Sequence, residues 1–220
     1  MYKVNKRVQF NECLICSQIL LKNMNILDFL YPIPICETCI RQFGFINKTI
    51  QFYHYPLHIL YIYNDFFKAL LYQYKGVYDY ALKDVFLCLY KNELKERYKN
   101  YIVVVAPSSK EDNQRRGFAP MEEIAKTIFL HVFNGIYKLS KYKQSDYSFE
   151  ERKKVKDKMS IMNKQMLKGK NVLILDDVLT SGSTLKTCLD LVLQCHPKKV
   201  ELMVLSTHQN LEELEERFKN

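Results

Sequence analysis

The residues best suited to bind a ligand lie together at positions 176–184. Two adjacent carboxylates, Asp176 and Asp177, follow the apolar residues 172–175, and a segment rich in hydroxyl groups comes next. That segment contains Thr180, Ser181, Gly182, Ser183 and Thr184. A helix that begins here offers free backbone N–H groups and the positive end of its dipole to a phosphate, and glycine lets the backbone come close.

The two carboxylates refine this interpretation. They repel a bare phosphate, but they accept hydrogen bonds from ribose hydroxyls or lie near Mg²⁺. The pattern of residues 176–184 therefore predicts a site for a ribose 5-phosphate. The alternative is a strand followed by an ordinary capped helix.

Four cysteines near the N-terminus have the spacing of metal ligands. Cys13 and Cys16 form one Cys-X-X-Cys pair, and Cys36 and Cys39 form another about twenty residues later. Two such pairs satisfy a tetrahedral zinc site made of four thiolates. A segment of about 40 residues buries too little apolar surface to fold alone, so a metal crosslink is needed. We expect structural zinc here, with redox-active dithiols as the alternative.

Strands and helices that alternate along the chain must position these residues. Apolar residues predict strands at 59–63, 101–107, 172–175 and 200–205, and another is expected at 135–139. Helices are predicted at 66–74, 79–98, 120–132, 182–195 and 211–218, with a polar loop at 108–117. Residues 141–170 are predicted to form a loop with one short helix. This order predicts an α/β fold with a parallel sheet flanked by helices.

A basic stretch at residues 138–170 mixes cations with aromatic side chains. The net charge of +9 favours polyanionic partners, although genome composition alone also produces such a charge. Cations interleaved with aromatic rings suit the backbone and bases of a nucleic acid, and a solvated flap over an active site fits equally well. The candidate nucleic-acid residues are Lys141, Lys143, Arg152, Lys153 and Lys154.

Residues 176–184 resemble, position for position, the phosphoribosyl pyrophosphate (PRPP) motif of type I phosphoribosyltransferases. The resemblance implies Asp176 and Asp177 at the ribose hydroxyls and residues 180–184 around the 5-phosphate, with Mg²⁺ bound alongside PRPP. It also implies that pyrophosphate binds after the first core strand. The cations expected there are Lys110, Arg115 and Arg116, for which a solvated surface loop is the alternative.

Other segments resemble the ComF family of competence proteins. Residues 71–76 (LYQYKG), with Ala81 soon after, are similar to its YKG segment, and residues 115–118 (RRGF) to its RGF turn. Residues 143–145 and Arg152 are weaker echoes of a further loop. With the cysteine pairs, the resemblance covers roughly residues 10–206 and is to the ComFC type, a zinc module fused to a phosphoribosyltransferase domain.

The sequence also departs from that family. Residues 119–120 are Ala-Pro where Asn-Gln is common, and Lys153 stands where an Asn usually follows the Arg. The resemblance implies a competence-type factor for DNA uptake in natural transformation, which binds single-stranded DNA and PRPP or ribose 5-phosphate beside an ATP-dependent DNA translocase. The alternative is a Mg²⁺-dependent phosphoribosyltransferase that acts on a nucleobase or an amine.

We expect three parts in the chain: a zinc-binding module at 1–50, a phosphoribosyltransferase-like domain at 51–206 and a helical tail at 207–220. The sequence contains no apolar stretch typical of a signal peptide or a membrane span. We therefore expect a cytoplasmic protein without membrane insertion.

Overall fold

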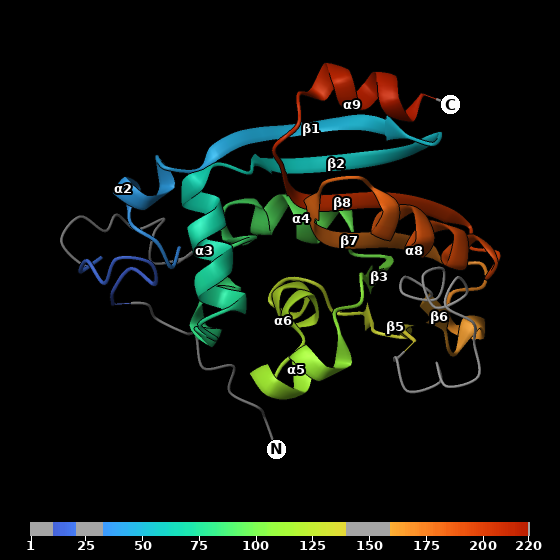
Figure 1. Cartoon of the computed structure of the whole chain (residues 1–220), viewed down its shortest axis with the longest axis horizontal. Helices are drawn as coiled ribbons and strands as arrows, with labels where there is room; N and C mark the ends of the chain where they lie inside the picture. Colours follow the sequence, from blue (N-terminus) through green and yellow to red (C-terminus); the bar gives the residue numbers. More distant parts are fainter. Residues whose placement is uncertain (1–10, 21–32, 140–158, 220) are drawn as a thin grey trace, which may run out of the picture.

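A computed structural model describes residues 11–20, 33–139 and 159–219 of the chain. Its main feature is a six-stranded sheet in the order β1-β2-β8-β7-β3-β4 (Figure 1). The strands are β1 (Gly44–Phe52), β2 (Tyr55–Ile62), β3 (Tyr101–Val105), β4 (Val132–Phe133), β7 (Asn171–Leu179) and β8 (Lys199–Thr207). Neighbours from β2 to β4 pair in parallel, whereas β1 and β2 are antiparallel. The predicted α/β class is confirmed, with a mixed rather than a wholly parallel sheet.

The antiparallel edge comes from a hairpin that the sequence analysis missed. Phe52 pairs with Tyr55, so only Tyr53 and His54 form the turn. Both have positive φ values, 46° and 69°, as the commonest two-residue hairpin turns require. The predicted strand at 59–63 therefore begins earlier, at Tyr55. The expected module boundary between residues 50 and 51 falls inside β1.

Helices cover both faces of the sheet (Figure 1). On one face, α3 (Asp65–Lys75), α4 (Lys91–Arg97) and α6 (Pro120–Lys126) pack on residues such as Val103 and Leu173. On the other face, α8 (Ser183–Leu193) and α9 (Leu211–Phe218) pack on residues such as Ile174 and Leu202. The apolar central strands are buried on both sides, as their uninterrupted hydrophobic runs predict.

The predicted helix at residues 79–98 is wrong as a single element. The structure has 3₁₀ turns η2 (Tyr80–Asp84) and η3 (Cys88–Tyr90) before α4. Val85, Phe86 and Leu87 are all fully buried. Three consecutive side chains cannot lie on the single buried stripe of a surface helix, so the chain unwinds to bury them all.

The predicted polar loop at 108–117 contains α5 (Lys110–Arg116) instead. The Ser109 side chain caps this helix by accepting from the Asp112 N–H, and Gly117 ends it at φ 83°. The next helix begins at Pro120 as predicted, but it ends at Lys126, and Val132 belongs to β4.

A small second sheet pairs β5 (Ile136–Lys138) with β6 (Met159–Ile161), followed by η5 (Lys164–Met166). The strand expected at 135–139 is confirmed, whereas residues 159–161 are a strand and not the predicted loop. Near the cysteines lies the short helix α2 (Glu37–Ile40). In the described part of the chain, no helix has the length and apolar character needed to span a bilayer.

Candidate functional site

Strand β7 carries Asp176 and Asp177 within it, because it continues to Leu179 and does not end at residue 175 as predicted. Successive strand side chains point to opposite faces. Asp177 lies on the face of α3, where it forms an ion pair with Lys75. Asp176 accepts a hydrogen bond of 2.9 Å from the Asp177 N–H. Strand geometry thus directs the two acids differently while keeping them adjacent.

Residues 180–184, which we call the 180–184 loop, join β7 to α8. Gly182 has φ 79° and is buried. A Cβ there would lie 3.0 Å from Phe218 Cζ and 3.0 Å from Phe52 Cε2, so a larger residue would strain the backbone and crowd both rings. The Ser181 and Ser183 hydroxyls lie 2.8 Å apart at the start of α8. The loop therefore presents clustered hydroxyls at a helix N-terminus, as its sequence predicts.

A cavity of about 310 Å³ lies against this loop; we call it the loop cavity. Both aspartates and the whole 180–184 loop line it. Its other walls include Lys75, Pro107, Ser108, Ser109, Asp112 and Lys138. The predicted acids, hydroxyls and helix start are thus brought together around one space.

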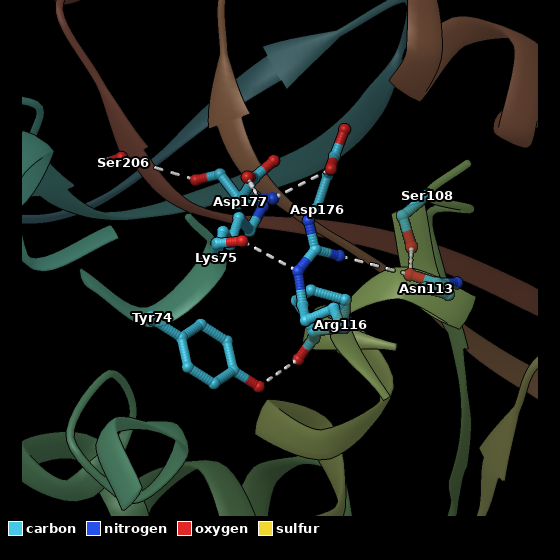
Figure 2. Close-up of polar contacts among 9 residues, drawn as sticks. Tyr74, Lys75, Ser108, Asn113, Arg116, Asp176, Asp177 and Ser206 are labelled. Carbon is cyan, nitrogen blue, oxygen red and sulfur yellow. Dashed lines mark hydrogen bonds and ion pairs between the residues drawn. The ribbon is translucent and has the colours of Figure 1, made fainter. Parts of the chain in front are cut away.

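Lys75 supplies the positive charge closest to the acids (Figure 2). Burial raises the pKa of Asp177, but the Lys75 ammonium outweighs burial and holds that pKa below its usual range. Arg116 Nε in turn donates to the Lys75 carbonyl at 2.8 Å. The Arg116 guanidinium also donates to Asn113 Oδ1 at 3.3 Å. Helices α3 and α5 are therefore tied to each other and to β7 at this point.

The pKa of Asp176 moves in the opposite direction to that of Asp177. Burial, and then the negative charge of Asp177, raise the pKa of Asp176 well above its usual range. An ionised carboxylate only accepts hydrogen bonds, whereas a protonated one donates as well. A raised pKa favours the protonated form of Asp176, so the pair can both accept hydrogen bonds from hydroxyl groups and donate one to them.

Two further cavities adjoin the loop cavity. One, of about 410 Å³, lies under α5 and α6 and shares Pro107 and Ser108 with the loop cavity. The other, the α3–α5 groove of about 650 Å³, shares Lys75 and Asp177 with it. These two have no lining residue in common, so they open on the loop cavity from different sides.

The three cations expected near pyrophosphate separate in the structure. Lys110 lines the cavity under α5 and α6. Arg115 is exposed in the α3–α5 groove and forms an ion pair of 3.0 Å with Asp112. Arg116 lines the same groove and holds the Lys75 carbonyl. Only Lys110 therefore lies on the side away from the groove.

Sequence reasoning missed Lys75 and Asn113 as site residues. Lys75 belongs to the LYQYKG segment, but its partner lies 102 positions later, which no local pattern reveals. Asn113 also accepts a 2.6 Å hydrogen bond from the Ser108 hydroxyl. The candidate nucleic-acid residues of the sequence analysis, from Lys141 to Lys154, lie outside the described residues.

The four N-terminal cysteines form one cluster. Their Sγ atoms all lie within 4.8 Å of one another. Cys13 Sγ lies 3.8 Å from Cys39 Sγ, and Cys16 Sγ lies 3.6 Å from Cys36 Sγ. A tetrahedral zinc site with Zn–S bonds of about 2.3 Å has sulfur–sulfur edges of about 3.8 Å. The cluster is therefore compatible with zinc.

Solved structures with similar chains include nucleotide-metabolism enzymes. Adenine phosphoribosyltransferase from Giardia lamblia is 15% identical, with 78% of this chain and 97% of that chain covered and a TM-score of 0.40. Purine phosphoribosyltransferase from Pyrococcus horikoshii is 22% identical over 57% and 73% of the two chains, with a TM-score of 0.34. The match covers only 22% of an allosteric regulatory enzyme of purine biosynthesis and 32% of the phosphoribosylpyrophosphate synthetase from Mycobacterium smegmatis. No curated protein matches this chain significantly.

The family of this chain is assigned by a match to a family model and not by these structural similarities. The model for the phosphoribosyl transferase domain matches residues 93–218, which is more than half of the 220-residue chain. The match runs from α4 to α9 and includes β7 and the 180–184 loop. The chain therefore belongs to the phosphoribosyl transferase domain family.

Proposed function

We propose that this protein binds PRPP, together with Mg²⁺, in the loop cavity. The observation that carries the proposal is the convergence of the acid pair and the hydroxyl-rich helix start on one cavity of about 310 Å³. The 5-phosphate would meet the N-terminus of α8 and the hydroxyls of the 180–184 loop. The ribose hydroxyls would meet Asp176 and Asp177, which together offer acceptors and a donor.

The surroundings of the cavity suit transfer of the phosphoribosyl group. In such a transfer the bond from the ribose C1 to pyrophosphate breaks, and a new bond forms from C1 to the acceptor. Lys110 and Ser108 on one side would meet the pyrophosphate, and the α3–α5 groove on another side would receive a nucleobase or amine. Mg²⁺ would neutralise charge on the pyrophosphate as it leaves. Lys75 lowers the pKa of Asp177 and so favours its ionised form, which would accept a hydrogen bond from a ribose hydroxyl.

Calorimetry with Mg²⁺–PRPP tests the binding proposal. We expect Asp177→Asn to weaken binding by at least about tenfold, the equivalent of one lost charged hydrogen bond. Asp190→Asn is the matched control, because Asp190 lies on the exposed side of α8 and pairs only with Lys186 among the described residues. Wild-type protein that does not bind PRPP, or equal binding by the Asp177 variant, would exclude the loop cavity as the site.

We also propose that the cysteine cluster binds one structural zinc ion. The support is the fit of the sulfur–sulfur distances to a tetrahedral thiolate site. Cys13, Cys36 and Cys39 are buried and belong to the same hydrophobic core cluster as Phe43 and Leu60. The metal would therefore crosslink the N-terminal segment where it packs on the domain.

A second candidate function is that of a ComF-type competence factor that handles single-stranded DNA during uptake, beside an ATP-dependent DNA translocase. One observation favours it: two of the segments that carry the resemblance, LYQYKG and RRGF, meet at the site. Lys75 of the LYQYKG segment pairs with Asp177, while Arg116 of RRGF donates to the Lys75 carbonyl (Figure 2). In this function PRPP would be a ligand or signal, and binding of a labelled oligonucleotide would test it.

A further inference from the structure

The backbone that leads into the 180–184 loop is held by residues at the end of β8. The Ser206 hydroxyl donates to the carbonyl of Asp177 at 3.4 Å. The Thr207 hydroxyl donates to the carbonyl of Leu179 at 3.2 Å. Both hydroxyls are almost fully buried. Hydrogen bonds from β8 side chains therefore hold two carbonyls of the last residues of β7, just before the 180–184 loop.

The next two carbonyls, inside the loop, are held by the segment after β8. Arg217 of α9 donates through Nη2 to the carbonyl of Ser181 at 3.2 Å. The Gln209 side-chain amide is oriented so that its nitrogen and its oxygen both have partners. Its nitrogen donates to the carbonyl of Thr180 at 3.1 Å. The Gln209 amide oxygen accepts a hydrogen bond from Arg217 Nη1 at 3.2 Å. One guanidinium thus holds one loop carbonyl directly and a second through the Gln209 amide.

These contacts fix the direction of two backbone N–H groups. In a trans peptide group the N–H points opposite to the C=O of the preceding residue. Because the carbonyls of Thr180 and Ser181 point towards Gln209 and Arg217, the N–H groups of Ser181 and Gly182 point away from these two side chains. Neither N–H donates to an acceptor within the described residues. Ser181 and Gly182 line the loop cavity, whereas Gln209 and Arg217 do not, so the two donors belong to the cavity wall and point away from the residues that hold the carbonyls.

Helix α9 is itself firmly placed. The Phe218 ring packs on Phe52 with ring centroids 4.4 Å apart, and Phe218 is 2% exposed. The Tyr53 N–H donates to the Phe218 carbonyl at 3.2 Å. The Asn210 side chain caps the start of the helix by accepting from the Glu212 N–H. A helix anchored at both ends can hold Arg217 at a constant distance from the loop.

We infer that Arg217, acting with Gln209, is a positioning residue for the ligand's 5-phosphate. It orients the Thr180–Ser181 and Ser181–Gly182 peptide groups so that their N–H groups are ready to bind a phosphate oxygen. Arg217 acts through the loop and does not contact the ligand. The inference rests on the proposed binding of PRPP in the loop cavity, and it assigns the C-terminal helix a part in that binding.

The test compares three ligands by calorimetry: ribose 5-phosphate, Mg²⁺–PRPP and Mg²⁺–pyrophosphate. Arg217→Ala is expected to weaken binding of the first two by a similar factor of about ten, a loss of about 1.4 kcal/mol. Binding of pyrophosphate should stay unchanged, because its proposed position is beside Lys110 and Ser108 and not at the 180–184 loop. Arg217→Lys keeps the charge and one donor and should recover part of the loss.

Two further variants make the test decisive. Lys219→Ala removes one positive charge close to Arg217 in the chain, so it controls for a general charge effect and should bind all three ligands normally. Gln209→Leu removes the amide without altering α9, and it should show a smaller loss confined to ribose 5-phosphate and PRPP. Urea unfolding of each variant shows whether it remains folded.

The outcomes separate the two proposals. Wild-type protein that binds neither ribose 5-phosphate nor PRPP would contradict the proposed function itself. Wild-type binding that Arg217→Ala and Gln209→Leu leave unchanged would overturn only the positioning role. An equal loss for pyrophosphate would also overturn it, because that result indicates a general effect of charge or folding.

Discussion

Lys75, the last residue of α3, forms an ion pair with Asp177 on β7, 102 positions later in the chain. The side chains are 27% and 24% exposed, so water screens the pair only in part. Lys75 therefore does two things in the structure. It compensates one of two adjacent carboxylates, and it joins a helix outside the family match to the strand that carries the candidate site.

Breaking this ion pair should destabilise the fold. We expect Lys75→Met to lower the free energy of unfolding by about 1–3 kcal/mol, because Asp177 is left half-buried beside Asp176 without a counter-charge. The double variant Lys75→Met with Asp177→Asn should lose less than the sum of the single variants. Urea denaturation measures all three. Lys68→Met, at an exposed position of the same helix, is the control, and strict additivity would contradict a coupling between Lys75 and Asp177.

Stability at acid pH should depend on Glu201. This buried carboxylate of β8 accepts hydrogen bonds from the Tyr98 hydroxyl at 3.2 Å and the Tyr101 hydroxyl at 2.7 Å, and it pairs with Lys199 at 2.7 Å and Arg97 at 3.2 Å. Burial raises its pKa, but Lys199 and Tyr101 outweigh burial and lower the pKa from 4.5 to about 2.

A lowered pKa in the folded state stabilises the protein above the unfolded value of 4.5, and this stabilisation is lost as the pH falls towards about 2. The gap in unfolding free energy between wild type and Glu201→Gln should therefore be widest above pH 4.5, up to about 3 kcal/mol, and should narrow at lower pH. Denaturation at a series of pH values measures this gap. A gap that does not change with pH would show that the charge of Glu201 is not the cause.

Purified protein is expected to contain one equivalent of zinc per chain. Cys36→Ser should lose the metal and lower the thermal stability, because three thiolates cannot complete the tetrahedral site. Elemental analysis gives the metal content, and calorimetric melting gives the stability. Cys88→Ser, which changes a cysteine outside the cluster, should retain zinc. Full zinc content in the Cys36 variant would remove the cluster as the zinc site.

Single-stranded DNA should bind with a strong dependence on salt if the competence-type function is right. The logarithm of the affinity is expected to fall by about 0.7 per phosphate contact for each unit of log salt concentration. Neutralising Arg152, Lys153 and Lys154 together should flatten that slope by up to about three contacts. Anisotropy of a labelled oligonucleotide measures the slope, and Arg115→Ala with Arg116→Ala should flatten it less.

The interpretation of the basic stretch as an active-site flap predicts the reverse for the same triple variant. It would bind DNA normally and lose affinity for PRPP. Absence of DNA binding at low salt by intact, zinc-loaded protein would contradict direct DNA binding by this chain.

The parts of the site that local sequence signals encode could be predicted. An apolar run, two acids and a hydroxyl-rich segment with Gly182 lie within a few residues of each other, and their pattern specifies strand, loop and helix start. The helix start at Pro120 is likewise a local signal that the structure confirms. The spacing of the four cysteines was enough to predict that they cluster.

The features of the fold and the site that the sequence analysis missed depend on contacts between segments that are distant in the chain. Residues 79–98 have helical spacing, but the burial of Val85, Phe86 and Leu87 against several elements breaks the helix. The hairpin turn at Tyr53 and His54 lacks the Asn-Gly or Asp-Gly sequence that usually reveals such turns. Arg217 lies in a charged helix whose sequence gives no sign of a loop carbonyl as its partner.

The position of β8 in the sheet has a consequence for any shortened version of the chain. On one side β8 pairs with β2, which precedes the family match at residues 93–218. A fragment restricted to the matched residues would leave β8 with a free edge of unpaired N–H and C=O groups along an almost entirely buried, apolar strand. Such an edge is a template for pairing with other chains. We therefore expect the fragment of residues 93–218 to aggregate. In the full chain the β1–β2 hairpin prevents this, because β2 pairs with β8 and satisfies its N–H and C=O groups.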